Sequence, residues 1–432
     1  MFDRPLFTSR REFLAGSLTF LSTAGTLPIF LGHTARALAG PEPKKGKRGS
    51  AERILVVIQL AGGNDGLNTV VPYEMDAYFK ARPRIAIQQK QVLKLTGGVG
   101  LHPAATALKE LYDAGRMAVV QGVGYPNPNR SHFTSMDIWH TADPDLRTHE
   151  GWLGRYFDNC CAGSDPAGGV ESIQGVALMQ EMPLAMQGDK FMPLSFDDPN
   201  ALAWQGGRRD ALAEETFLKL NNRSGDWPKT GGELAQYLQR AALDAQVGAT
   251  EIREAGGREL KSTAGRPRGR RGGGLARQLE LVARMIAADL PTRVYYVSMG
   301  GFDTHTGQEG RHRQLLTEFG DGVSQFIETL DDAKLLDRVL ILSFSEFGRR
   351  VQENASGGTD HGEAAPLFLF GSKVRPGVHE KHPSLTNLHR GDLQFGCDFR
   401  RVYSTVLRQW LDVPPDKVLG KGFQPLNVLR TS

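Results

Sequence analysis

Cysteine is scarce in this chain, which has three in 432 residues. Cys160 and Cys161 are adjacent, and neighbouring cysteines rarely bridge each other because the ring is strained. One long-range disulfide to Cys397 stays open, although it would leave one thiol free. The spacing resembles no zinc cluster, so we expect the cysteines to be structural.

An excess of charge of one sign is also missing. The formal net charge is +4, which argues for neither a nucleic-acid partner nor an anionic membrane surface. A composition of 40% hydrophobic and 23% charged residues is typical of a soluble globular protein. The length allows one large α/β domain or two ordinary ones.

A strongly apolar run that could cross a membrane is lacking as well. Residues 15–31 are only moderately apolar and contain Pro28, two glycines and several Ser and Thr, which make a poor spanning helix. They follow Ser-Arg-Arg-Glu-Phe-Leu at 9–14, and this combination is typical of a twin-arginine export signal. A retained anchor is the alternative. We expect cleavage after Ala39, or after Ala37.

The predicted signal sets the expected organisation of the chain. Residues 1–39 would be read by the twin-arginine translocase, 40–51 would form a basic linker, and 52–432 would form a single α/β domain. The mature protein is then expected to be periplasmic or secreted, without a stable membrane span. Because this pathway carries folded proteins, it suits one that is preloaded with a metal or cofactor.

Five short apolar runs predict the strands of a central sheet. They lack period-2 alternation, which indicates strands buried on both faces of a mostly parallel sheet. The expected fold is therefore a three-layer α/β/α sandwich. The runs are residues 54–60, 117–120, 294–299, 339–344 and 367–370.

Helices, an insertion and a loop are expected between these runs. Residues 163–230 are mixed in pattern and predict a cap or insertion over the sheet. Residues 253–274 are dense in Gly and Arg and predict a flexible loop, for which a nucleic-acid role is disfavoured in an exported protein. Helices are predicted over 74–82, 104–114, 133–140, 152–160, 211–220, 232–247, 275–290, 310–330 and 398–411.

Ligand-type side chains gather where these strands begin or end. Asp360 and His361 lie in a glycine-rich turn before a strand, and Asp303 and His305 follow another strand. Alternate residues on an extended loop point the same way, and carboxylate plus imidazole is a common ligand set for zinc, manganese or iron. Asp65, after two glycines, is either a further ligand or an ordinary turn aspartate.

Three more positions have two interpretations each. Glu346, at the end of an apolar strand, must face a cation, a cavity or Arg349. Ser131 is either a helix N-cap or a nucleophile whose anionic intermediate lies at the helix N-terminus. Arg130 would pair with a phosphate or sulfate, or else form a structural salt bridge. His132 is placed to hold or protonate a leaving group.

The order of these motifs resembles the domain of unknown function 1501 family over nearly the whole mature chain. That family is similar in turn to the alkaline phosphatase superfamily, which contains phosphatases, arylsulfatases and phosphopentomutases. The motifs are Leu-Ala-Gly-Gly-Asn-Asp-Gly-Leu-Asn at 60–68, Asn-Arg-Ser-His-Phe at 129–133, Gly-Gly-Phe-Asp-Thr-His at 300–305, Ser-Glu-Phe-Gly-Arg at 345–349 and Gly-Thr-Asp-His-Gly at 358–362.

The resemblance implies an alkaline-phosphatase-like fold and two divalent metal ions, which would be zinc, manganese, calcium or magnesium. It implies that Ser131 is the catalytic nucleophile, assisted by Arg130 and His132. The implied metal ligands are Asp65, Asp303, His305, Glu346 and His361.

Two departures from the superfamily pattern qualify this expectation. Phe347 stands where the superfamily has a histidine ligand, and none of the three cysteines begins a sulfatase signature. The resemblance as a whole still implies an exported metal-dependent hydrolase of phosphate or sulfate esters, with a small molecule or a glycan as the substrate. The alternative is a non-catalytic exported protein of the same fold that binds an anionic cell-envelope ligand.

Overall fold

The computed structural model describes residues 53–160, 173–189, 193–202, 248–258, 260 and 274–430. The predicted signal (1–39), the linker (40–51) and the helices predicted over 211–220 and 232–247 lie outside these residues. None of the described helices is long and apolar enough to cross a membrane.

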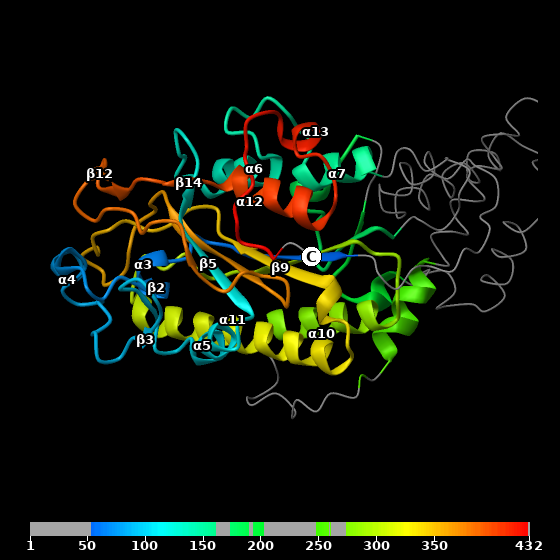
Figure 1. Ribbon diagram of the computed structural model, residues 1–432, viewed down its shortest axis with the longest axis horizontal. Coiled ribbons are helices and arrows are strands. Elements are labelled where there is room, and N and C mark those ends of the chain that lie inside the picture. Colours follow the sequence, from blue (N-terminus) through cyan, green and yellow to red (C-terminus); the bar gives the residue numbers. More distant parts are fainter. Residues whose placement is uncertain are drawn as a thin grey trace, which may run out of the picture.

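A mixed, mostly parallel sheet forms the centre of the described structure (Figure 1). In spatial order its strands are β11 (Gly377–His379), β5 (Met117–Gly124), β10 (Ala365–Phe370), β9 (Val339–Phe344), β1 (Ile54–Leu60), β8 (Val294–Met299), β6 (Gly175–Ala177) and β7 (Leu194–Ser195), and β14 (Cys397–Asp398) also pairs with β5. β10 runs antiparallel to both neighbours, whereas the other pairs are parallel. The predicted α/β fold with a mostly parallel sheet is confirmed.

Helices cover both faces of this sheet (Figure 1). One layer contains α5 (Thr106–Asp113), α10 (Gly274–Ala287) and α11 (Gln308–Asp332). The other contains α6 (His132–Thr141), α7 (Trp152–Cys160), α12 (Phe399–Thr405) with the π-helical turn η4 (Val406–Trp410), and α13 (Asp416–Leu419).

Smaller elements complete the described part. Two short helices, two small sheets and three 3₁₀ turns connect the main elements. They are α3 (Gly66–Thr69), α4 (Asp76–Ala81), β2 (Val70–Val71), β3 (Leu93–Lys94), β4 (Gly100–Leu101), β12 (Leu388–His389), β13 (Asp392–Leu393), η1 (Leu184–Met186), η2 (Pro199–Leu202) and η3 (Leu336–Arg338).

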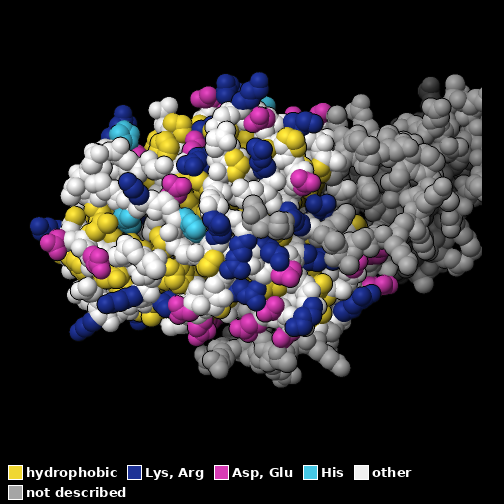
Figure 2. All heavy atoms as spheres, in the orientation of Figure 1, with side chains coloured by type: hydrophobic (Ala, Val, Ile, Leu, Met, Phe, Trp, Pro, Cys, Tyr) yellow, Lys and Arg dark blue, Asp and Glu magenta, His cyan; other side chains and the backbone are white. Residues whose placement is uncertain are grey.

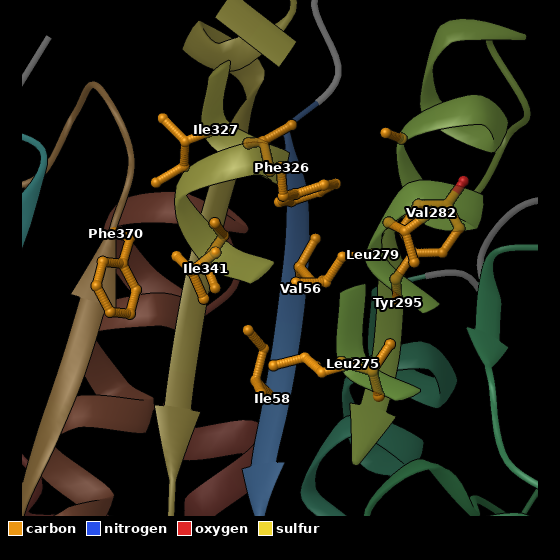
Figure 3. Packing of buried hydrophobic residues seen from close by; sticks show 14 of the residues in the cluster. Val56, Ile58, Leu275, Leu279, Val282, Tyr295, Phe326, Ile327, Ile341 and Phe370 are labelled. Atoms are coloured by element: carbon orange, nitrogen blue, oxygen red, sulfur yellow. The ribbon is translucent and has the colours of Figure 1, made fainter. Parts of the chain in front are cut away.

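Alternation along the buried strands divides the core into two clusters, because successive side chains point to opposite faces of a sheet. Val56 and Ile58 of β1 pack with α10 and α11, as Figure 3 shows. Leu55 and Val57 of the same strand belong to the cluster under α6, α7 and α12. Both faces of β1 are therefore covered, which explains why Gln59 is its only polar residue.

Two predicted regions differ from the structure. Residues 248–257 are helical, so the loop predicted from residue 253 is wrong for 253–257. Ile252 and Ala255 are buried in the core, and Arg284 donates to the carbonyl of Gly256 at 2.6 Å, so packing outweighs the Arg and Gly content. Within 163–230, β6 and β7 extend the central sheet at its edge.

Three of the five predicted strands have the expected bounds. β1, β8 and β9 have the predicted bounds, whereas β5 continues beyond residue 120 to Gly124. The sequence pattern ends at Gln121 and Gly122, but both are buried in the sheet, and Gly122 has φ 60°.

The two described cysteines, Cys160 and Cys397, are free thiols. A disulfide between these two is therefore not formed, and Cys161 lies outside the described residues. On the face seen in Figure 2, a group of Lys and Arg side chains lies near the middle of the molecule with acidic side chains around it, in keeping with the small net charge.

Three buried histidines should make the fold sensitive to acid. His140 lies within hydrogen-bonding distance of the Tyr296 hydroxyl (3.0 Å), and burial lowers its pKa to about 3. Burial likewise lowers the pKa of His102 to about 3 and of His312 to about 4. Their folded pKa values lie below the unfolded value, so the unfolded state binds more protons below about pH 6.5.

We therefore expect the free energy of unfolding to be fully retained above about pH 6.5 and to fall as the pH drops, by up to ~1.4 kcal/mol per pH unit for each histidine. Urea unfolding at pH 7, 6 and 5 measures this slope. The His140→Gln variant is the control, because its stability should depend less steeply on pH. Equal slopes for the two proteins would contradict the assignment.

Candidate metal centre

The loop after β8 presents two of the predicted ligands, Asp303 and His305. Phe302 and Thr304 before and between them are buried, so the alternate side chains point out of the loop. A Cβ atom on Gly62, at the end of β1, would clash with the backbone nitrogen of Asp303. The glycine therefore lets the β1 turn pack directly against this loop.

His361 reaches the same edge of the sheet because β10 runs antiparallel to β9 and β5. The loop before β10 consequently meets the loops that follow β5, β8 and β9. The Nδ1 atom of His361 donates to the carbonyl of Arg130 at 2.8 Å. This contact leaves Nε2 as the lone-pair nitrogen of a neutral imidazole.

His132, the first residue of α6, adds a third imidazole. Its Nδ1 atom lies 2.8 Å from Oε1 of Glu346, so the carboxylate orients the ring. Its Nε2 atom is buried, has no hydrogen-bond partner, and lies 3.5 Å from Oδ2 of Asp303. An unpartnered buried nitrogen is unfavourable unless a ligand or ion occupies the space before it.

The Nε2 atoms of all three histidines lie near the carboxylate of Asp303. Oδ1 of Asp303 is 3.0 Å from Nε2 of His305 and 3.1 Å from Nε2 of His361. Ligand atoms of His132, Asp303 and His361 all lie within 4.8 Å of one another. The structure therefore brings together three of the five predicted metal ligands and adds His132, which the sequence assigned to the leaving group.

The imidazoles of His305 and His361 face each other through their Nε2 atoms. Their Nε2 atoms are 2.9 Å apart, and the Nδ1 atom of His305 faces Oδ1 of Asp360 at 3.2 Å. If both rings are neutral and both Nδ1 atoms donate, two lone pairs face each other and repel. A proton or a metal ion between the nitrogens removes this repulsion.

Arg349 places a fixed positive charge behind Asp303. Its buried guanidinium donates to Oδ1 of Asp303 at 2.6 Å and to the carbonyls of Gly62, Gly63, Phe302 and Thr359. Desolvation opposes ionisation of Asp303, but the hydrogen bond and the positive charge of Arg349, together with the contacts to His361 and His305, outweigh it and lower its pKa to about 2. Asp303 is therefore a permanent anion at neutral pH.

The imidazoles flanking Asp303 have different proton affinities. The hydrogen bond to Glu346 raises the pKa of His132 above its ordinary value. Burial lowers the pKa of His361 below its ordinary value, which keeps this ring neutral and its Nε2 lone pair available. A neutral imidazole is the form that binds a metal ion.

Phe347 forms an apolar wall against the centre. Its ring centroid lies 4.9 Å from that of His132 and 4.7 Å from that of His361. A Cβ atom on Gly63, which has φ +74°, would clash with the Phe347 ring. The aromatic residue at this position therefore packs against His132 and His361 and offers no ligand atom of its own.

Asp65 is placed apart from this group. Its Oδ2 atom accepts from Arg82 at 2.6 Å, both side chains are fully buried, and Oδ1 caps α3 through the backbone nitrogen of Asn68 at 3.3 Å. Burial opposes ionisation, but Arg82 overcomes it and the pKa of Asp65 is lowered. These contacts favour a structural role for Asp65, although it was predicted as a ligand.

Glu346 contacts the centre through other groups. Besides His132, its Oε1 atom accepts from the backbone nitrogen of Gly62 at 2.8 Å. The carboxylate therefore fixes His132 and the β1 turn together. A cation was the expected partner of Glu346, and the observed partners are an imidazole, a peptide N–H and the hydroxyl of Ser345, which donates to Oε2 at 3.2 Å.

The two other predicted catalytic residues lie next to the centre. Ser131 is exposed, precedes α6 as its N-cap, and makes no side-chain capping hydrogen bond. Arg130 forms ion pairs with Asp392 and, at 3.7 Å, with Glu363, so the salt-bridge interpretation holds for its side chain. Sequence reasoning missed Arg82 and Asp392, because no local pattern marks the buried partner of a distant charge.

The chain is similar to solved structures and to a family model. No curated protein sequence matches it. The lipoteichoic acid synthase LtaP from Listeria monocytogenes is 10% identical, with a TM-score of 0.36, over 84% of this chain and 80% of the other. The PsFucS1 sulfatase from Pseudoalteromonas sp. is 9% identical, with a TM-score of 0.37, over 93% of this chain and 75% of the other.

The alkaline phosphatase from the Antarctic bacterium TAB5 is 10% identical, with a TM-score of 0.31, over 76% of this chain and 95% of the other. A family model described as "Protein of unknown function (DUF1501)" matches residues 117–385, which is more than half of the chain. The chain belongs to the DUF1501 family.

Proposed function

We propose that this protein is an exported metal-dependent hydrolase that acts on phosphate or sulfate esters. The observation that carries the proposal is the convergence of three imidazole Nε2 atoms on Asp303. The ester class follows from the resemblance of the ordered motifs to the alkaline phosphatase superfamily. Export through the twin-arginine translocase to the periplasm or beyond remains part of the proposal, as does a small-molecule or glycan ester as the substrate.

The donor atoms of His132, Asp303 and His361, which all lie within 4.8 Å of one another, fit one divalent transition metal ion, and His305 lies beside them. Four atoms at tetrahedral positions around a zinc ion, with bonds of about 2.0–2.1 Å, would lie ~3.3 Å apart. The contacts of Asp303 with the Nε2 atoms of His305, His361 and His132 are 3.0, 3.1 and 3.5 Å. Three nitrogens and one carboxylate suit zinc better than calcium or magnesium, which prefer oxygen ligands.

The histidines are also oriented as metal ligands usually are. Each Nδ1 atom faces a second group, which is Glu346 for His132, Asp360 for His305 and the Arg130 carbonyl for His361. Such partners fix the tautomer and the orientation of a ligating ring. The side chain of Asp303 is 47% exposed and that of His305 is 41% exposed, so the centre is open to solvent and to a substrate.

A bound divalent metal would polarise the ester and lower the pKa of a hydroxyl beside it. Ser131, whose hydroxyl is not used as a helix cap, is the nucleophile. Its oxygen forms a bond to phosphorus or sulfur while the bond to the ester oxygen breaks, and the serine proton passes to solvent or to the leaving oxygen. The N-terminus of α6 favours the negative charge on the covalent intermediate. Water then attacks the phosphorus or sulfur, the bond to the serine oxygen breaks, and the serine hydroxyl is restored as phosphate or sulfate leaves.

The Ser131→Ala variant tests the catalytic part of this proposal. We expect its hydrolysis of aryl phosphate or aryl sulfate esters to fall by at least ~100-fold, because the nucleophile is lost, while its zinc content stays that of the wild type. The measurements are turnover of a chromogenic ester and metal analysis by mass spectrometry.

The matched control is Ser135→Ala, which removes a hydroxyl one helical turn further along α6. That hydroxyl is buried and donates to the backbone carbonyl of Glu346 at 2.5 Å, so the variant should keep the nucleophile. A wild-type protein that holds metal but hydrolyses none of these esters would instead support a non-catalytic protein that binds an anionic envelope ligand. Absence of both metal and turnover would contradict the proposal.

A further inference from the structure

A buried carboxylate on the β12–β13 hairpin lies behind the metal centre. The side chain of Asp392 is fully buried and forms an ion pair with the guanidinium of Arg130. Nε of Arg350 lies 3.2 Å from the other oxygen of Asp392, and the same guanidinium donates to the carbonyl of Arg390 at 2.6 Å. Two arginines therefore pair with this carboxylate and oppose the effect of burial, which raises its pKa.

Glu363 extends the contact on the other side of Arg130. It lies 3.7 Å from the Arg130 guanidinium, and His389 lies 2.9 Å from the same carboxylate. Arg130 is thus held by acidic groups from two segments, the hairpin and the loop before β10. We infer that this arrangement fixes the backbone of Arg130 as well as its guanidinium.

The backbone of Arg130 is what connects this cluster to the metal centre. Its carbonyl accepts from Nδ1 of His361 at 2.8 Å, which determines which nitrogen of His361 faces Asp303. The next two residues are Ser131 and His132, the proposed nucleophile and a proposed ligand. A displacement of Arg130 would therefore change the centre at three points.

We propose that Asp392 is a positioning residue for the metal centre. Through Arg130, its carboxylate holds the carbonyl that orients His361 and thereby sets the affinity and coordination geometry for a divalent transition metal ion. This inference rests on the proposed function. The competing explanation is an ordinary salt bridge that contributes to stability only.

Cobalt(II) is the probe, because its visible absorption reports coordination geometry without any need for turnover. In the full-length mature protein, Asp392→Asn is expected to weaken cobalt binding by about 10–100-fold, the usual effect of losing an outer partner of a metal ligand. Its absorption bands at saturating cobalt should also shift. A salt bridge that acts on stability alone would leave the bands of the folded, saturated protein unchanged.

The matched control is Asp398→Asn, which removes another carboxylate paired with an arginine, Arg400 at 2.6 Å, at the start of α12. This variant should bind cobalt as the wild type does. If Asp392→Asn fails to fold, the variant Arg130→Gln tests the proposal instead. In that variant Asp392 keeps its contact with Arg350, so the buried carboxylate stays paired. The cobalt affinity of Arg130→Gln should fall by at least ~5-fold and its absorption bands should shift, because this variant also disturbs an outer partner of a metal ligand.

The outcomes distinguish a failure of the proposed metal centre from a failure of the positioning role of Asp392. A wild-type protein that binds neither cobalt nor zinc overturns the proposed metal centre and the role of Asp392 with it. A wild-type protein that binds cobalt, together with folded variants that match its affinity and its spectrum, overturns the role of Asp392 alone.

Discussion

Replacing Asp303 with Asn is expected to reduce the affinity for zinc by more than ~100-fold, because the residue that all three ligand histidines face loses its charge. The amide keeps an oxygen for Arg349, which donates to Oδ1 of Asp303 at 2.6 Å. The fold should therefore survive the substitution. Competition with a chromogenic chelator measures the affinity, and thermal unfolding of the metal-free protein checks the fold.

An exposed aspartate outside the centre provides the control for this prediction. Asp145 pairs with Arg147 at 3.3 Å and lies in the turn after α6. Asp145→Asn should leave the zinc affinity unchanged. Zinc binding of wild-type strength in Asp303→Asn would show that the histidines and Asp303 form a polar network and not a metal site.

Replacing Asp65 with Ala is expected to cost about 3–5 kcal/mol of unfolding free energy, because it leaves the buried Arg82 cation unpaired. Both side chains have no exposed surface, and the guanidinium of Arg82 also contacts Asn68 at 2.7 Å and the carbonyls of Arg350 and Val351. Urea unfolding of the metal-free protein measures the loss.

The double variant Asp65→Leu with Arg82→Met is the control, since it removes both charges and should recover most of the stability. This experiment also separates the two interpretations of Asp65. A structural residue affects stability while zinc binds the folded variant normally. If Asp65→Ala is as stable as the wild type but binds zinc weakly, Asp65 is a ligand after all.

Much of the fold was predictable, because local sequence determines it. β1, β8 and β9 have only one polar residue each, since both of their faces are covered, and such apolar runs identify buried strands. The direction of β10 was not predictable, because the sequence of a buried strand is the same for either direction. It depends on pairing with β9 and β5, which lie far apart in the sequence.

The candidate site was also predictable only in part, from residues that local sequence marks. Asp303, His305 and His361 stand out because polar ligand types end or precede apolar strands. Asp65 has the same local pattern, yet its partner is Arg82, and only the tertiary structure shows that the pair is buried. The roles of Glu346 and His132 differ from the prediction for the same reason, since the two residues meet across 214 residues of sequence.

The antiparallel direction of β10 has a consequence for the order of folding. The segment 345–364 connects the end of β9 to the start of β10 on the same side of the sheet. Backbone hydrogen bonds within the segment close it, such as those from the Gly348 N–H to the Glu363 carbonyl (2.9 Å) and from the Gly362 N–H to the Gly348 carbonyl (2.8 Å). Contacts of low sequence separation form quickly, whereas His132 joins only after distant strands have docked. A metal ion that needs both halves would bind late, and it would protect the protein by slowing unfolding more than by speeding folding.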